Sequence, residues 1–100
     1  MKIYIAGPMT GHQDFNRAAF NAEAERLQRY GHTVLNPATL PGGLELREYM
    51  DICFAMLRSA DAILMLPGWQ ASSGATAEYH YAYQMKLSVF STLNYPPVAE

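Results

Sequence analysis

Short apolar runs alternate along this chain with longer segments in which apolar residues recur every three or four positions. The runs predict strands at residues 3–6, 32–35, 61–66 and 88–91. The longer segments predict helices at residues 14–30, 44–59 and 72–86. Strand and helix therefore alternate as βαβαβαβ. This order predicts the α/β class and a three-layer α/β/α sandwich, Rossmann-like or flavodoxin-like, around about four parallel strands.

Turn-forming residues mark the ends of these elements. Gly31 stands where a glycine commonly ends a helix, and Asp14 or Asn16 can cap the start of the same helix. Composition does not shift along the chain, and neither repeats nor low-complexity segments occur. We therefore expect a single domain over residues 1–100.

Three loops follow the carboxyl ends of the first three predicted strands, at residues 7–14, 36–43 and 67–74. In parallel α/β sheets, ligands bind outside the carboxyl ends of the strands, next to the switch in strand order. These loops also hold most of the glycines, prolines and small polar residues of the chain. The chemistry of the protein is therefore expected in these loops.

Composition and charge narrow the classes of partner. Seven Lys and Arg stand against nine Asp and Glu, for a net charge of −2 with no basic run, which argues against binding of duplex nucleic acid. A small ligand such as a nucleoside or nucleotide fits better. Charged residues make up only 16% and aromatic residues 12% of the chain, so we expect a second copy to cover part of the surface. A homodimer or higher homo-oligomer follows as an expectation.

The same inventory bears on localisation. Cys53 is the only cysteine, so no internal disulfide forms, and no Cys and His cluster has the spacing of a zinc site. No stretch approaches the roughly 18 apolar residues of a membrane span, and the apolar start is too brief for a signal peptide. We therefore expect a cytoplasmic protein that does not bind membranes.

One acidic residue stands out in the third predicted helix. By their spacing, the residues that share one face of this helix are Ala71, Gly74, Ala75, Glu78, Ala82 and Met85. A carboxylate on the sheet-facing side, below a ligand loop, is costly unless it has partners or a task. Glu78 is therefore a candidate catalytic residue. The alternative is a carboxylate in the first helical turn, stabilised by the helix dipole and solvated at the edge of the sheet.

The start of the same helix offers a place for an anion. Ser72, Ser73 and Gly74 can supply backbone N–H groups and hydroxyls to a phosphate or a carboxylate. An ordinary N-cap is the alternative. The chain has no Walker loop, no glycine pattern of dinucleotide binding and no nucleophile elbow, which argues against hydrolysis through a serine nucleophile.

Other polar residues are expected to be structural or solvated. His32 begins a strand, and Asp61 opens the longest apolar run at the amino end of the sheet. His80 faces away from Glu78 on its helix. His12 lies in a ligand-side loop, where a solvated histidine is commoner than a catalytic one.

Several phrases of the sequence resemble a known superfamily. They are residues 3–8, residues 60–66, and residues 72–78 followed by Ala82. On these residues the chain resembles the nucleoside 2-deoxyribosyltransferase-like superfamily. Within it, the chain is similar to the short phage and bacterial proteins grouped as a domain of unknown function, DUF4406. The segments similar to that subgroup are Met9-Thr10-Gly11, residues 31–38 and residues 66–69.

The resemblance implies chemistry at the N-glycosidic bond of nucleosides or nucleotides, by an N-glycosidase or a deoxyribosyltransferase. It implies that Glu78 attacks the anomeric carbon, while Ser72 and Gly74 hold a 5′-phosphate. The residues implied to line the sugar or base are Tyr4, Gly7 and Pro8. No cofactor and no metal are implied.

The pattern of the superfamily breaks at Cys53, where its enzymes carry an aspartate that helps to protonate the leaving base or to orient the ligand. Asp51 is a possible leaving-group acid, but it lies two positions away, about 200° around the helix. The alternatives are a residue of a partner chain or a different reaction. Loss of a general acid typically lowers a rate by about 10²–10⁴-fold. An enzyme is therefore one expectation and a non-catalytic nucleotide-binding module another.

A third hypothesis is an oligomeric accessory protein with a vestigial cleft, whose interface holds Trp69, Tyr79 and Tyr83. The last residues, 95–100, contain two prolines and can cross such an interface, with fraying as the alternative. A chain of one hundred residues leaves no lid or second domain to close over a substrate. Exclusion of water then has to come from a second subunit. We expect a homodimer whose interface borders the site.

Overall fold

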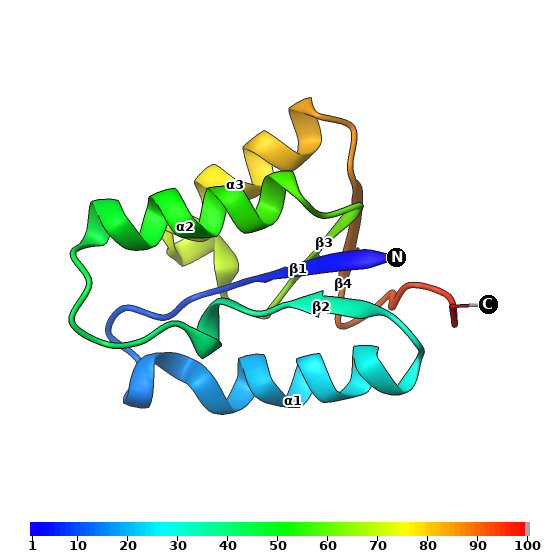
Figure 1. Ribbon diagram of the computed structural model, residues 1–100, viewed down its shortest axis with the longest axis horizontal. Coiled ribbons are helices and arrows are strands. Elements are labelled where there is room, and N and C mark those ends of the chain that lie inside the picture. Colours follow the sequence, from blue (N-terminus) through cyan, green and yellow to red (C-terminus); the bar gives the residue numbers. More distant parts are fainter. Residues whose placement is uncertain (100) are drawn as a thin grey trace.

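Four parallel strands form the centre of the fold, in the order β2-β1-β3-β4 (Figure 1). The computed structural model describes residues 1–99. The strands are β1 Lys2–Ala6, β2 Thr33–Leu35, β3 Ala62–Met65 and β4 Ser88–Ser91. Each neighbouring pair runs parallel, so the predicted four-stranded parallel sheet is confirmed.

Helices cover the two faces of this sheet. They are α1 Arg17–Arg29, α2 Leu46–Arg58 and α3 Ser73–Gln84. α1 packs alone on one face, while α2 and α3 share the other, which gives the predicted α/β/α layers (Figure 1). Short 3-10 turns lie in the loops, at η1 Gln13–Asn16, η2 Pro37–Thr39 and η3 Trp69–Ala71. Within residues 1–99, none of the helices combines the length and the apolar character needed to span a membrane.

Alternating side chains of β1 divide the core in two. Ile3 and Ile5 pack on the α1 side, whereas Tyr4 and Ala6 face α2 and α3. Both faces of this central strand are covered, which explains why its sequence is an apolar run without polar alternation. The strand leads into Gly7, where a Cβ would lie 2.7 Å from the Cβ of Leu66. The close approach of the two strand ends therefore requires a glycine there.

The start of α1 differs from the prediction. Asn16 occupies the N-cap position, but its side chain does not cap the helix and instead donates to the carbonyl oxygen of Pro8 at 3.0 Å. Asp14, Phe15 and Asn16 all have left-handed backbone, with φ of 49°, 52° and 61°. Asp and Asn tolerate this conformation, but it costs about 1–2 kcal/mol at a residue such as Phe15. The loop before α1 is therefore a strained turn. The end of the helix agrees with the prediction, since Gly31 has φ of 89°.

The predicted buried face of α3 is confirmed in the middle of the helix. Ala75, Glu78 and Ala82 are buried. Ala71 and Met85 are exposed because both lie beyond the ends of the helix, so the prediction that they share this face is wrong.

The aromatic residues beside α3 do not all lie free on the surface. Trp69 is half-buried, and its ring centroid lies 4.8 Å from that of Tyr79. Under the third hypothesis Trp69 is an exposed interface residue, and this expectation of exposure is wrong because the ring packs on its own chain. Tyr83 is exposed, with its ring stacked on that of Tyr79.

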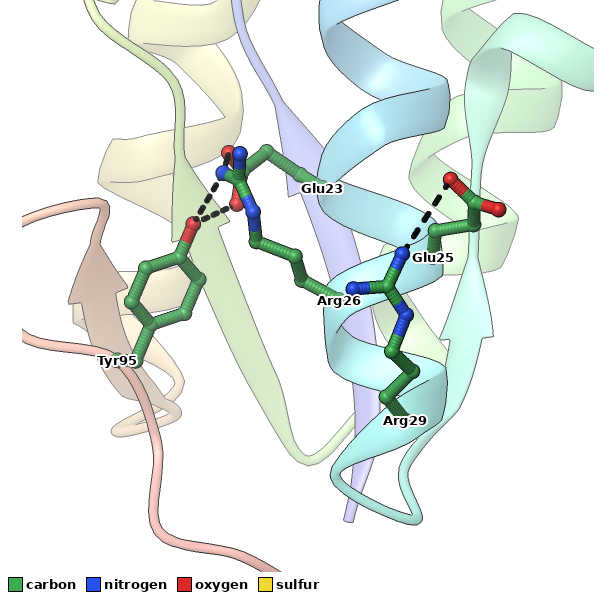
Figure 2. Close-up of polar contacts among 5 residues, drawn as sticks. All are labelled: Glu23, Glu25, Arg26, Arg29 and Tyr95. Atoms are coloured by element: carbon green, nitrogen blue, oxygen red, sulfur yellow. Dashed lines mark hydrogen bonds and ion pairs between the residues drawn. The ribbon is translucent and has the colours of Figure 1, made fainter.

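The segment after β4 returns to α1. The Tyr95 hydroxyl donates to the carboxylate of Glu23, and Arg26 donates to both of these groups (Figure 2). The N–H of Ala99 donates to the carbonyl oxygen of Tyr30 at 2.8 Å. Residues 95–99 therefore pack on their own chain, so the expectation of fraying is wrong, while a place for this tail at an interface stays a prediction. Glu100 lies outside the described residues.

Two of the polar residues expected to be structural are structural. The ring of His32 is buried, and its Nε2 donates to the carbonyl oxygen of Pro97 at 2.7 Å. Asp61 accepts the N–H of Lys2 at 2.8 Å, and this bond holds the pKa of the Asp61 carboxyl below its usual value. His80 is exposed. These contacts lie away from the carboxyl ends of the strands, where ligands bind in such sheets.

Candidate active site

A pocket of about 640 Å³ opens beyond the carboxyl ends of the central strands. Its walls come from the three loops that were predicted to hold the chemistry and from the N-terminal halves of α2 and α3. The sheet order places β1 beside β3, and their chains continue into helices on opposite faces. This is the switch point at which α/β sheets leave a crevice. The volume lies within the range of about 300–1,000 Å³ that small-molecule sites occupy.

The pocket brings nearly all of the predicted site residues together. Those that line it are Tyr4, Gly7, Pro8, Ser72, Gly74 and Glu78. Asp51 does not line it, because this residue lies on the exposed side of α2. Cys53, two positions further along, does line it. The structure therefore separates the possible leaving-group acid from the rest of the predicted site.

Glu78 and Tyr4 form a buried pair at this pocket. Glu78 is 5% exposed and lies in the second turn of α3, so the alternative of a solvated carboxylate in the first turn is wrong. The Tyr4 hydroxyl donates to Oε2 of Glu78 at 2.5 Å. Tyr4 reaches it from β1, because the even-numbered side chains of that strand face α2 and α3. Neither Arg nor Lys bonds this carboxylate among the described residues.

Burial without a cation sets the protonation of the pair. Burial raises the pKa of the Glu78 carboxyl from 4.5 to about 7, against the opposing effect of the hydrogen bond from Tyr4. Burial, followed by the charge of Glu78, raises the pKa of Tyr4 far above its usual range. Tyr4 therefore stays a hydroxyl donor. Glu78 divides near neutral pH between a carboxylic acid and a carboxylate, which is the range useful for proton transfer and nucleophilic attack.

Cys53 is the third member of this cluster. It is buried on α2, and its thiol and the Tyr4 hydroxyl perturb each other's pKa. Burial raises the pKa of the Cys53 thiol, so the thiol is protonated at neutral pH. A protonated thiol of raised pKa is a weak proton donor. Cys53 therefore does not reproduce the chemistry of an aspartate.

The start of α3 combines a cap with free donors. The Oγ of Ser72 accepts the N–H of Ala75 at 3.2 Å, and the Ser72 carbonyl oxygen accepts the N–H of Thr76 at 2.9 Å. The N-cap alternative for the Ser72 side chain is therefore confirmed. In the part of the chain that the structure describes, the N–H groups of Ser73 and Gly74 have no protein acceptor. Both residues line the pocket, and such helix-start donors suit an anionic group.

Sequence reasoning missed the part of the pocket that lies at the start of α1. Arg17 and Phe15 line it there, and Met50 lines it from α2, with its Sδ 3.4 Å from where a Cβ on Gly74 would lie. The available signal was the position of Arg17 in the first turn of the helix predicted at residues 14–30, which follows a ligand-side loop. His12 also lines the pocket and is exposed. Across residues 1–99, no group of three or more His, Cys, Asp or Glu side chains is placed to hold a metal ion.

The chain was compared with models of protein families. The family model described as a domain of unknown function (DUF4406) matches residues 1–91. No curated protein matches the chain. The matched region contains the sheet, the three helices and every residue that lines the pocket, and it ends where β4 ends.

Proposed function

The chain belongs to the DUF4406 family, and from that premise we propose that it acts on the N-glycosidic bond of a nucleoside or nucleotide with Glu78 as the nucleophile. The observation that carries this proposal is the buried Tyr4–Glu78 pair at the pocket. The resemblance to the nucleoside 2-deoxyribosyltransferase-like superfamily supplies the class of reaction. The protein would then be an N-glycosidase or a deoxyribosyltransferase of the cytoplasm that uses neither metal nor cofactor.

In the proposed reaction, the Glu78 carboxylate attacks the anomeric carbon of the sugar. The bond from this carbon to the base breaks, its electron pair stays on the base nitrogen, and that nitrogen takes up a proton. The result is a glycosyl ester of Glu78. Water or a second base then attacks the same carbon and frees the carboxylate, which distinguishes hydrolysis from transfer. Tyr4 bonds Oε2, so it orients the carboxylate and leaves Oε1 for the attack.

The remaining pocket residues take supporting roles in this proposal. At the start of α3, after the N-cap residue Ser72, the N–H groups of Ser73 and Gly74 donate hydrogen bonds to a 5′-phosphate. Tyr4, Gly7 and Pro8 line the sugar or the base. Glu78 lies one turn along the same helix from Gly74, about 6 Å by the rise of an α-helix. A phosphate at one position and an anomeric carbon at the other therefore match the dimensions of a nucleotide.

Protonation of the leaving base is the step for which the pocket has no evident proton donor besides Glu78. Glu78 is the only carboxylate among the described residues that line the pocket, and Cys53 holds a thiol of raised pKa. Asp51 lies outside. We assign the proton to solvent or to a residue of a second copy. Bases that leave readily are the substrates expected to react fastest.

We propose that a second copy of this chain covers the mouth of the pocket. Leu46 and Phe15 line the pocket, yet both are large apolar side chains exposed to solvent. Water exclusion favours reactions of this type, and a second copy packed on these side chains would provide it. A homodimer in solution, measured by light scattering, is the expected state.

The second candidate function is a nucleotide-binding module without turnover. The specific observation that favours it is Cys53, a thiol of raised pKa at the position where the resemblance implies an aspartate. In this case the pocket and the helix-start donors bind the ligand and no base is released. If nucleotides do not bind at all, an accessory role in an oligomer remains.

The decisive experiment measures base release by chromatography. Purified protein is incubated with ribo- and deoxyribonucleosides and with their 5′-monophosphates, and free base is quantified. Glu78→Gln keeps the shape and the hydrogen bond from Tyr4 but is not a nucleophile, so we expect the rate to fall by at least about 10³-fold. The matched control is Glu23→Gln, which changes the other buried glutamate bonded by a tyrosine and leaves the pocket intact.

The outcomes separate the candidates. Release by the wild type and by Glu23→Gln, but not by Glu78→Gln, supports the enzyme. Nucleotide binding in calorimetry without any release supports the binding module. Release that survives in Glu78→Gln would contradict the assignment of the nucleophile, provided that this variant has a native circular dichroism spectrum.

A further inference from the structure

Arg17 is the positively charged side chain of the pocket. Among the described lining residues it is the only Lys or Arg, and it opens α1 directly after the strained turn at residues 14–16. We propose that Arg17 determines specificity for a phosphorylated ligand, so that the substrate class is a nucleoside 5′-monophosphate and not a free nucleoside. This inference deepens the proposed function and rests on it.

The topology places Arg17 across the crevice from the start of α3. α1 follows β1 and packs on one face of the sheet, whereas α3 follows β3 and packs on the other (Figure 1). Both helix starts line the same pocket, with Arg17 on one side and Ser73 and Gly74 on the other. A ligand in the crevice at this switch point therefore meets backbone N–H donors from one side and a guanidinium from the other.

The two sides contribute different properties. The N–H groups of Ser73 and Gly74 have no protein acceptor within residues 1–99, but they carry no formal charge. A phosphate of charge near −2 that leaves water needs a counter-charge as well as hydrogen bonds. Arg17 is the pocket group that provides it, with a planar fork that matches two phosphate oxygens. A deprotonated Glu78 adds a further negative charge to the pocket, which increases the need for a positively charged group.

The present partner of Arg17 is easily exchanged. Its guanidinium bonds Oδ1 of Asp14 at 2.8 Å, and the Asp14 side chain is 71% exposed. Pairs this exposed contribute little to stability, in the range of about 0–1 kcal/mol. The guanidinium also lies over the ring of Phe15, 5.2 Å from its centroid, which holds the side chain at the pocket. Asp14 and Phe15 thus hold Arg17 at the pocket, and a phosphate can replace Asp14 as the partner of its guanidinium.

The experiment compares affinities for ligands that differ only in the phosphate. Calorimetry measures each deoxynucleoside 5′-monophosphate and its free nucleoside against wild type, Arg17→Gln and Arg17→Lys. A charged hydrogen-bonded contact corresponds to about 10- to 100-fold in affinity. We expect Arg17→Gln to lose this factor for the monophosphate, with less than about a twofold change for the nucleoside. Arg17→Lys is expected to recover part of the loss because it keeps the charge but not the fork.

Two further variants serve as controls. Arg29→Gln removes an arginine from the other end of the same helix, where it faces Glu25 at 3.8 Å, and we expect no change in affinity (Figure 2). Asp14→Asn frees Arg17 while keeping a residue that tolerates left-handed backbone. The affinity of this variant for the monophosphate is expected to rise by about two- to fivefold.

The outcomes keep this inference apart from the proposed function. If wild-type protein binds nucleoside and monophosphate equally, or if Arg17→Gln weakens both alike, the role of Arg17 is overturned, while base release dependent on Glu78 can still hold. If Arg17→Gln selectively weakens the monophosphate and wild type releases no base, the role of Arg17 stands and the enzyme proposal fails.

Discussion

Two buried glutamates of this chain each accept a hydrogen bond from a tyrosine hydroxyl, and the two pairs differ in charge. Glu23 is 6% exposed and Glu78 is 5% exposed. Glu23 accepts from Tyr95 and also from Arg26, whose guanidinium lies 2.5 Å from it (Figure 2). Glu78 accepts from Tyr4 without a cation. The first pair ties the segment after β4 to α1, and the second lies at the pocket.

The comparison shows which feature separates a structural carboxylate from a reactive one. Burial and a tyrosine partner are common to both pairs, so neither of them identifies function. An arginine beside Glu23 compensates its charge, and burial of such a carboxylate is then tolerated. Glu78 lacks this compensation, and its pKa is raised to about 7 as a result of burial. An uncompensated carboxylate facing a cavity is therefore the feature that marks the site.

The largest effect expected from this difference is on the pH dependence of stability. The pKa of Glu78 rises from 4.5 in the unfolded chain to about 7 in the fold, so the folded state holds a proton that the unfolded state releases between these values. The resulting stability is fully present below about pH 4.5 and is lost as the pH rises through about 7. The difference amounts to about 3 kcal/mol. Urea unfolding between pH 4 and pH 8 measures it.

Substitution of the two glutamates tests the assignment of this pH dependence. Glu78→Gln cannot ionise, so its unfolding free energy is expected to fall less with pH and to exceed that of wild type at pH 8. Glu23→Gln keeps Glu78 and is expected to keep the wild-type slope. If the unfolding free energy of Glu78→Gln changed with pH as steeply as that of wild type, another group would release the proton. Glu78 would then not differ from Glu23 in this respect.

The fold was more predictable than the contacts that make the site. The apolar run from Ala62 to Leu66 predicted a strand buried on both faces, and the rule for carboxyl ends of parallel strands then located the pocket. Glu78 followed from helical spacing. The contact between Glu78 and Tyr4 could not be predicted from the sequence, because it joins residues 74 positions apart and depends on how α3 packs on β1.

The turn before α1 shows a second limit of sequence reasoning. Asp14, Phe15 and Asn16 adopt left-handed backbone in succession, and although Asp and Asn tolerate this conformation, nothing about Phe15 predicts it. This turn places Arg17 at the pocket, and tertiary contacts such as the bond from Asn16 to Pro8 hold it. The path of residues 95–99 was unpredictable for a similar reason, since Glu23 and Tyr95 are 72 positions apart.

A smaller effect is expected from removing the hydroxyl of the reactive pair. Tyr4→Phe deletes the bond that lowers the pKa of Glu78, so that pKa rises further and less carboxylate exists at pH 7. We expect kcat/KM for base release to fall by about 10- to 100-fold, with the midpoint of its pH profile displaced to higher pH. Tyr95→Phe is the matched control, with both quantities unchanged. A fall in rate with an unmoved midpoint would mean that Tyr4 serves packing alone and does not position Glu78.

The smallest effect is expected at the structural pair. Tyr95→Phe removes a hydroxyl that bonds Glu23 and Arg26, but the ion pair between these two residues remains, so the carboxylate stays compensated. We expect a loss of about 1 kcal/mol in unfolding free energy. The loss is local, because the hydroxyl ties only the segment after β4 to α1. Hydrogen exchange at the N–H of Ala99, which bonds the carbonyl oxygen of Tyr30, should therefore accelerate while the amides of β1 keep their protection. Equal acceleration in β1 would show that this pair supports the whole fold. The Tyr95–Glu23 and Tyr4–Glu78 pairs would then differ only in that Arg26 accompanies the first.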